Sequence, residues 1–170
     1  MNDNHKLIFR LANEIQIPRI MEIIWSASHH MQEKGIDQWD EVYPNKETIL
    51  NDIKNQDLYV ALRDDRIVAI VVLNQESDES YDKVEWRFPK ATSFVIHRLC
   101  VDPAYQGRGI AREVMCYCMW RLRTIGAKSI RLDVFSKNPE ALALYENLGF
   151  EIMGYANYRK GKFYLLERGI

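Results

Sequence analysis

The sequence predicts one mixed α/β domain, in which helices flank a largely antiparallel sheet. Two observations point to this fold class. The 170 residues are 47% hydrophobic and 28% charged, which is typical of an average globular protein with one domain. Short runs rich in β-branched residues also alternate with stretches whose apolar residues recur at helical spacing. We therefore expect a single domain over residues 1–170, long enough to bury a core without disulfides or metal.

Charge and apolar runs exclude several classes of protein. The net charge is -1, so the chain lacks the basic surface of a general nucleic-acid or anionic-membrane binder. The longest apolar run, 67–73, is far shorter than the ~18 residues of a membrane helix. Residues 1–6 show no signal-peptide pattern, and Cys100, Cys116 and Cys118 form no CxxC pair. We expect a cytoplasmic protein without a disulfide framework, a metal site, or nucleic-acid or membrane partners.

The first half of the chain is expected to form a strand, two helices and a hairpin. Residues 7–11 form a short apolar strand, and helical spacing predicts an amphipathic helix over about 14–34. A shorter helix surrounds residues 48–53. The β-branched runs 58–62 and 67–73, separated by two aspartates, predict the hairpin.

The middle of the chain begins with a polar segment, 74–91. We expect it to be a long surface excursion, with room for a short strand around Trp86. Residues 93–101 then predict a strong strand. Apolar residues from Ile110 to Ile125 recur every three or four positions, which predicts a helix packed on the sheet and ended by Gly126.

The last part of the chain completes the alternation. Residues 130–135 predict a strand, and 138–148 a helix that starts with a proline and ends at a glycine. Residues 150–158 and 163–167 predict a hairpin closed around Lys160-Gly161. No repeat or linker divides the chain, so the elements are expected to share one mixed sheet.

One loop between a strand and a helix has the residues of an anion site. Gly107 and Gly109 precede a helix that starts at about Ile110. Glycines let backbone N–H groups approach a ligand, and the helix start adds the positive end of its dipole. Arg108 can add a charge-assisted contact. The dinucleotide fingerprint fails because Arg112 stands where its third small residue belongs, and no P-loop string occurs. A plain strand-to-helix turn remains the alternative.

Two linked motifs resemble the GNAT superfamily of N-acetyltransferases. The segment 101–111 resembles the family's acetyl-CoA pyrophosphate loop, [QR]-x-x-G-x-[GA], with Gln106, Gly109 and Ala111 at the defining positions. The segment 138–150 resembles the family's second cofactor segment. One predicted helix and one strand lie between the two, as in the family, and the resemblance covers nearly the whole chain. It implies a GNAT-like sheet with splayed central strands and acetyl-CoA as the acyl donor.

The resemblance also implies which residues hold the cofactor. In the family the strand before the loop carries a bulge and splays from the next strand, and acetyl-CoA lies in the opening. Backbone at Leu99 and Val101 would pair with pantetheine, and the N–H groups from Gln106 to Arg112 would bind the pyrophosphate. The expected cofactor-binding residues are Leu99, Cys100, Val101, Gln106, Gly107, Arg108, Gly109, Ile110, Ala111, Arg112, Asn138 and Tyr145. Asn138 is equally suited to capping its helix, and both roles are compatible.

Tyr145 matches the family's tyrosine that protonates the departing CoA thiolate. A thiolate leaving group has a pKa near 8.5, and a phenol with a pKa near 10 can supply its proton. The alternative is a tyrosine that packs on an amphipathic helix. No cysteine lies in a nucleophile motif, so direct attack in a ternary complex is expected rather than a covalent acetyl-enzyme.

The general base is less well defined by the sequence. Many family members have a glutamate where this chain has Val95, so that role does not carry over. His97 lies two residues further on the same strand face and titrates near neutrality, which makes it the candidate base. A histidine satisfied by hydrogen bonds in the sheet is the alternative, and Glu85 and His29-His30 are weaker candidates.

Three aromatic residues are candidates for the acceptor site. Trp39 and Tyr43 follow the first helix, in a region that tends to bind the acceptor in the resembling enzymes, and Trp86 lies in the polar excursion. Trp39 and Trp86 could instead be core residues beneath a loop. The expected function is acetyl transfer to a primary amine of a small metabolite, an antibiotic or a protein. The alternative is a non-catalytic acyl-CoA-binding module on the same fold. The sequence also allows a homodimer through its C-terminal strands.

Overall fold

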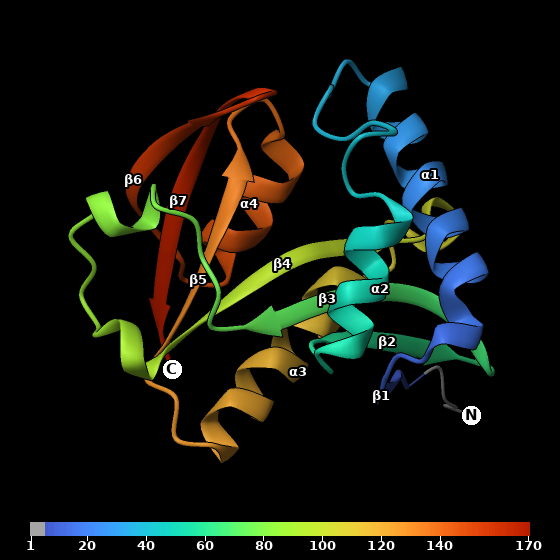
Figure 1. The fold of residues 1–170 in the computed structure, drawn as a ribbon, viewed down its shortest axis with the longest axis horizontal. Helices are drawn as coiled ribbons and strands as arrows, with labels where there is room; N and C mark the ends of the chain where they lie inside the picture. The colour runs from blue at the N-terminus through green and yellow to red at the C-terminus, as the bar shows by residue number, and fades with distance from the viewer. Residues whose placement is uncertain (1–5) are drawn as a thin grey trace. The chain divides into compact units, whose positions relative to one another are not determined.

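A computed structural model describes residues 6–170 of the chain (Figure 1). The segment 1–5, on which the signal-peptide expectation partly rests, lies outside the described residues. The chain packs as two compact units. The first contains the described residues up to Val72 together with Arg98–Met115, and the second contains Leu73–His97 and Cys116–Ile170. Among residues 6–170, no helix is both long enough and apolar enough to cross a membrane.

The order of the main elements is the one that the sequence predicts. The helices and strands are β1 (Ile8–Leu11), α1 (Ile17–Glu33), α2 (Lys46–Lys54), β2 (Leu58–Arg63), β3 (Arg66–Asn74), β4 (Ser93–Val101), α3 (Ile110–Thr124), β5 (Ser129–Phe135), α4 (Pro139–Asn147), β6 (Glu151–Tyr158) and β7 (Gly161–Gly169). The strands are hydrogen-bonded in the order β1-β2-β3-β4-β5-β7-β6. The predicted mixed α/β class, with a seven-stranded sheet and flanking helices, is confirmed.

In the first unit, α1 and α2 cover an antiparallel meander of β1, β2 and β3 (Figure 1). The buried stripe of α1, including Ile20, Ile23 and Ile24, follows the helical period and packs with apolar residues of β2 and β3. The predicted helix over 14–34 begins later, at Ile17, because residues 14–16 form a separate 3₁₀ turn. Two left-handed aspartates close the β2–β3 hairpin, as tight hairpin turns require.

In the second unit, β5 pairs antiparallel with β7, and β7 with β6. The first residues of β4 pair parallel to β5, from Ser93↔Ser129 to Val95↔Arg131. This ladder covers only these three pairs, although β5 continues to Phe135. Two parallel strands that are hydrogen-bonded only at their starts are what the expected splaying of the central strands requires.

The helix α3 departs from its predicted stripe at its end. Val114, Cys118 and Leu122 are buried, but Ile125 is half exposed because the helix ends at Thr124. Gly126 follows with a φ of 79°, the left-handed conformation that commonly ends helices.

Most residues of the polar excursion are exposed, as expected, but part of the segment packs on the second unit. The short strand expected around Trp86 does not form, and two 3₁₀ turns occur instead, Tyr81–Lys83 and Lys90–Thr92. Tyr81 is buried in the core of the second unit, and its ring stacks on Trp86 at 5.4 Å. A Cβ at Gly154 would come within 2.8 Å of Val84. The missing side chain on β6 therefore makes room for the excursion to pack.

A buried carboxylate helps to hold this segment in place. Glu167 accepts hydrogen bonds from the Arg131 Nε (3.0 Å), the Ser129 hydroxyl (3.1 Å) and the Arg87 backbone N–H (2.8 Å). The Arg131 guanidinium lies 4.4 Å from the centre of the Trp86 ring. A buried charge is tolerated only when it is paired and hydrogen-bonded, so this network fixes the excursion against β5 and β7.

Candidate functional site

The loop after β4 has the conformation of an anion cradle. Gly107 has a φ of 73° and Gly109 a φ of 77°, and a Cβ added at either would meet no atom within 4 Å. The glycines are therefore required by the left-handed backbone and not by packing, and the space beside them is open. Asp102 shapes the start of the loop, because its carboxylate accepts a hydrogen bond from the Ala104 N–H at 3.0 Å.

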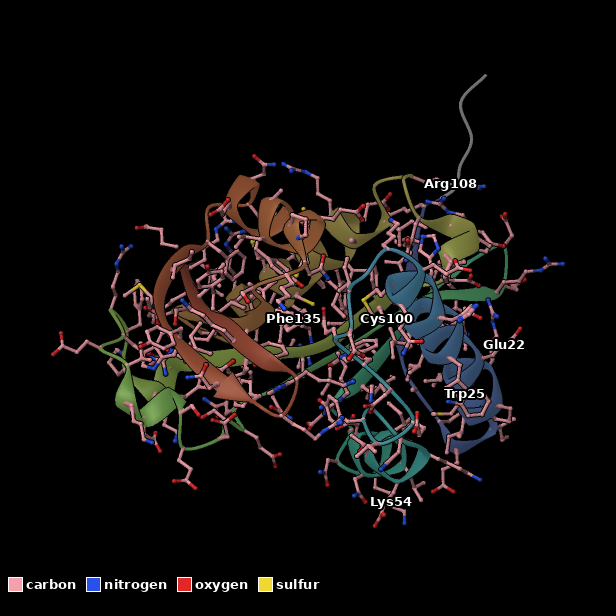
Figure 2. The ribbon with its side chains drawn as sticks, turned by 90° about the horizontal axis from the view of Figure 1, so that it is seen from above. Glu22, Trp25, Lys54, Cys100, Arg108 and Phe135 are labelled. Carbon is pink, nitrogen blue, oxygen red and sulfur yellow. The ribbon has the colours of Figure 1, made fainter. Side chains whose placement is uncertain are left out.

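The open loop leads directly into the N-terminus of α3 at Ile110. The first N–H groups of a helix have no partner within it, and the helix dipole is positive there. Arg108 lies at the surface of this loop, with its guanidinium 5.4 Å from the centre of the Tyr105 ring (Figure 2). These features fit a pyrophosphate-sized anion.

Gln106 departs in part from its expected role. Its backbone N–H donates to the Pro103 carbonyl at 3.3 Å, inside a short 3₁₀ turn. Its side-chain amide donates to the Val101 carbonyl at 3.1 Å. Gln106 therefore connects the loop to the end of β4, and the N–H groups suited to a ligand begin after it.

Helix α1 also supports this loop. The Arg19 guanidinium pairs with the Asp102 carboxylate, and it donates to the Ile67 carbonyl at 3.0 Å. The Arg19 guanidinium also pairs with the Glu22 carboxylate, at 3.1 Å. The loop is thus attached to both α1 and the start of β3.

The second half of β4 contains one residue with an unusual backbone, and a bulge there stays a prediction. Arg98 has a φ of 51° in the middle of the strand, which a non-glycine residue seldom adopts. Cys100, labelled in Figure 2, is buried, and burial raises the pKa of its thiol to about 12. A thiol that stays protonated is a poor nucleophile.

In the second unit, Tyr145 lies buried in the last turns of α4. Its ring meets Phe150 edge-on at 5.8 Å, and its carbonyl accepts the Phe150 N–H at 3.0 Å. Burial raises the pKa of Tyr145 well above its ordinary value, and the negative charge of Asp133 adds to the effect. The phenol therefore keeps its proton at neutral pH.

Asn138 acts as the cap that its sequence position also predicts. Its side-chain oxygen accepts the Ala141 N–H at 3.1 Å, at the start of α4. The capping alternative is therefore confirmed for this oxygen. Contact with a cofactor stays a prediction.

Asp133 is a candidate site residue that sequence reasoning missed. Its carboxylate accepts a hydrogen bond from the Tyr81 hydroxyl at 2.9 Å. Burial is the main cause of the raised pKa values of Tyr81, Tyr145 and Tyr158, and the charge of Asp133 adds to all three. A single acidic residue inside the apolar strand 130–135 was the available signal.

His97 makes hydrogen bonds that bear on its expected role as base. Its Nε2 lies 3.0 Å from the Asn74 side-chain oxygen and 3.1 Å from the Glu76 carbonyl. Two oxygen acceptors around one nitrogen favour the tautomer with the proton on that nitrogen. The alternative of a histidine satisfied by hydrogen bonds thus gains support at Nε2, and in this tautomer the basic lone pair is on Nδ1.

The three predicted acceptor-site aromatics differ in their surroundings. Trp39 is buried in the core of the first unit, and its carbonyl is held by Ser28 and Gln32 of α1. Trp86 donates its indole N–H to the Tyr81 carbonyl at 2.7 Å. Both fit the core alternative better than a binding wall. Tyr43 is 39% exposed, and its hydroxyl accepts from Arg98 at 2.6 Å.

Comparison with known proteins gives a family match over most of the chain. The model of the acetyltransferase (GNAT) family matches residues 17–150, a range that includes parts of both units. The range also includes the glycine loop and Tyr145.

Curated relatives match over shorter stretches. A mycothiol acetyltransferase of Brachybacterium faecium is 33% identical over 99 residues, which are 58% of this chain and 27% of that protein. A ribosomal protein bS18 alanine N-acetyltransferase of Salmonella typhimurium is 34% identical over 87 residues, 51% of this chain and 49% of that protein. The chain thus spans half or less of each of these relatives.

A solved structure matches over nearly the whole chain. A GNAT-family acetyltransferase of Streptococcus agalactiae has a TM-score of 0.85 at 23% identity, and the match covers 96% of this chain and 95% of that chain. At this identity the likeness supports the fold alone.

Proposed function

The chain belongs to the acetyltransferase (GNAT) family, and on that premise we propose that it transfers an acetyl group from acetyl-CoA to a primary amine by direct attack in a ternary complex. The observation that carries the proposal is the open glycine loop at the start of α3. We further propose that both units belong to one catalytic domain, because one family model matches across them.

Residues of the first unit are proposed to hold the cofactor. The N–H groups from Gly107 to Arg112 surround the pyrophosphate, and Arg108 adds positive charge. The backbone at Leu99 and Val101 pairs with pantetheine. Asn138 and Tyr145, both in the second unit, and Cys100 are further proposed cofactor contacts.

Acetyl-CoA supplies an activated thioester, whose C–S bond is exchanged for a C–N bond to the amine. Tyr145 is proposed to donate its phenolic proton to the departing sulfur. Burial raises the pKa of Tyr145, so the phenol is protonated at neutral pH and has a proton to donate.

The proton of the incoming ammonium needs an acceptor. An amine with a pKa of about 10.4 is neutral only about once in 10³ molecules at pH 7, a cost of roughly 4.6 kcal/mol. We assign this proton to the Asp133 carboxylate, which Tyr81 orients by a 2.9 Å hydrogen bond. The same negative charge attracts the ammonium form of the acceptor. His97 stays the alternative base, and the pH profiles of Asp133→Asn and His97→Ala distinguish the two residues.

The proposal is tested by following CoA release with a thiol reagent. Acetyl-CoA is offered with a panel of small primary amines, aminoglycosides and peptides that begin with alanine. We expect amine-dependent release in the native chain and release at least tenfold slower in Tyr145→Phe. Binding of acetyl-CoA without release above background for any amine would favour the non-catalytic acyl-CoA-binding module.

We also propose a cytoplasmic location and a homodimer formed through the C-terminal strands. The support for the dimer is that β6 is an edge strand with exposed Ile152 and Tyr155. Sedimentation of the purified chain tests it, and a monomer at micromolar concentration would contradict it.

A further inference from the structure

Arg98 combines an unfavourable backbone with an unusually well-held side chain. Its φ of 51° lies in the left-handed region, although it stands inside β4. The left-handed conformation is unfavourable for a residue with a side chain, so contacts with the surrounding structure must stabilise it.

The Arg98 guanidinium makes three short contacts. Its Nε and Nη2 donate to the two oxygens of Asp52 at 2.8 and 2.6 Å, and its Nη1 donates to the Tyr43 hydroxyl at 2.6 Å. The side chains of Arg98 and Asp52 are only 11% and 9% exposed. The planar fork thus joins three segments: β4, α2 and the loop before α2.

The loop that carries Tyr43 is itself well anchored. The Asp40 carboxylate accepts the backbone N–H groups of Val42 and Tyr43, at 3.0 and 3.3 Å. Ser28 and Gln32 hold the carbonyl of Trp39 from α1. The partners of Arg98 therefore belong to fixed parts of the first unit, and they can transmit a constraint to β4.

We propose that Asp52 and Tyr43, acting through Arg98, are positioning residues that hold the irregular end of β4 in the shape that accepts the pantetheine arm of CoA. This inference rests on the proposed function, which assigns pantetheine to the backbone at Leu99 and Val101. Leu99 directly follows Arg98 and Val101 lies three residues after it, so a change in the Arg98 backbone dihedral would rotate their N–H and C=O groups. Neither Asp52 nor Tyr43 is required to contact the cofactor.

The test compares CoA with 3′-phosphoadenosine 5′-diphosphate, its nucleotide half, which lacks pantetheine. Dissociation constants for both probes are measured by calorimetry for the native chain and for Arg98→Lys. Lysine keeps the charge but cannot reproduce the planar fork. The expected result is a loss of CoA affinity of about tenfold, with nucleotide affinity unchanged within about twofold.

The matched control is Arg87→Lys. Arg87 also binds a carboxylate with both terminal nitrogens, that of Glu151, but both side chains are more than half exposed. This substitution is expected to leave both dissociation constants unchanged. It removes a guanidinium fork outside the strand that the proposal concerns.

Tyr43→Phe is a second test variant, which keeps the inference testable if Arg98→Lys does not fold. It removes one hydroxyl from a partly exposed residue, and a loss of about threefold in CoA affinity is expected, again without loss for the nucleotide. Equal losses for both probes, or unchanged CoA affinity in folded Tyr43→Phe and Asp52→Asn, would overturn the inference. A native chain that binds neither probe would instead refute the proposed function.

Discussion

Gly109→Ala separates the two requirements that the glycine loop has to meet. Gly109 has a φ of 77°, and its added Cβ would meet no atom of the protein within 4 Å. The stability cost therefore comes from the backbone alone, about 1–2 kcal/mol for an L-residue in the left-handed region. For a chain of this size that lowers Tm by about 2–8 °C.

The effect on ligand binding should be larger than the strain alone explains. In the proposed complex, the methyl group occupies the space in which the pyrophosphate approaches the N–H groups. We expect CoA affinity to fall at least tenfold, as measured by calorimetry at a temperature where the variant is folded.

Gly126→Ala is the matched control. Gly126 has a φ of 79°, and its Cβ would also meet nothing within 4 Å, but it ends α3 instead of starting it. The same loss in Tm is expected, with unchanged CoA affinity. If both variants bind CoA alike, the loop is a plain strand-to-helix turn and the assignment of the pyrophosphate is refuted.

Three further predictions concern the second unit and the buried thiols. Tyr145→Phe should lower kcat at least tenfold while CoA still binds; an unchanged kcat, with chemistry shown to be rate-limiting, would remove Tyr145 from the mechanism. Asp133→Asn should abolish the acidic limb of the pH profile of kcat/KM, whereas His97→Ala should retain it; the opposite pattern would assign the base to His97. Burial raises the pKa values of Cys100 and Cys118 to about 12, above those of the unfolded thiols, so their contribution to stability is complete below about pH 8.5 and is lost as the pH rises towards 12. Denaturant unfolding between pH 8 and 10 should show this fall, and Cys118→Ala should make it shallower; equal slopes would contradict the assignment.

The order of elements was predictable because each has a local signal. The hairpin of β2 and β3 follows from two apolar runs around two aspartates, and the start of α4 from Asn138 before a proline. The glycine loop was predictable for the same reason, since its residues are adjacent in the chain.

The packing of the polar excursion 74–91 was not predictable, because the residues that it contacts are distant in sequence. Nothing near Trp86 indicates that Gly154, on β6, leaves room for Val84. Asp133 was missed for a similar reason, because its significance depends on Tyr81, 52 residues away. The core position of Trp39 depends on α1, and the local sequence fits a binding wall equally well.

The buried ion pairs change the meaning of the near-zero net charge. Arg98 pairs with Asp52 across 46 residues, and Arg131 with Glu167 across 36. Each unit thus contains one buried ion pair, whose opposite charges cancel in the net charge.

The proposed chemistry divides between the same two units. The first supplies backbone N–H groups and the strand that Arg98 holds, and the second supplies the phenol of Tyr145 and the carboxylate of Asp133. Substitutions at Gly109 or Arg98 should therefore appear in the dissociation constant of CoA, and those at Tyr145 or Asp133 in kcat. A variant of the first unit that lowers kcat at saturating CoA, with unchanged affinity, would show that this division is wrong.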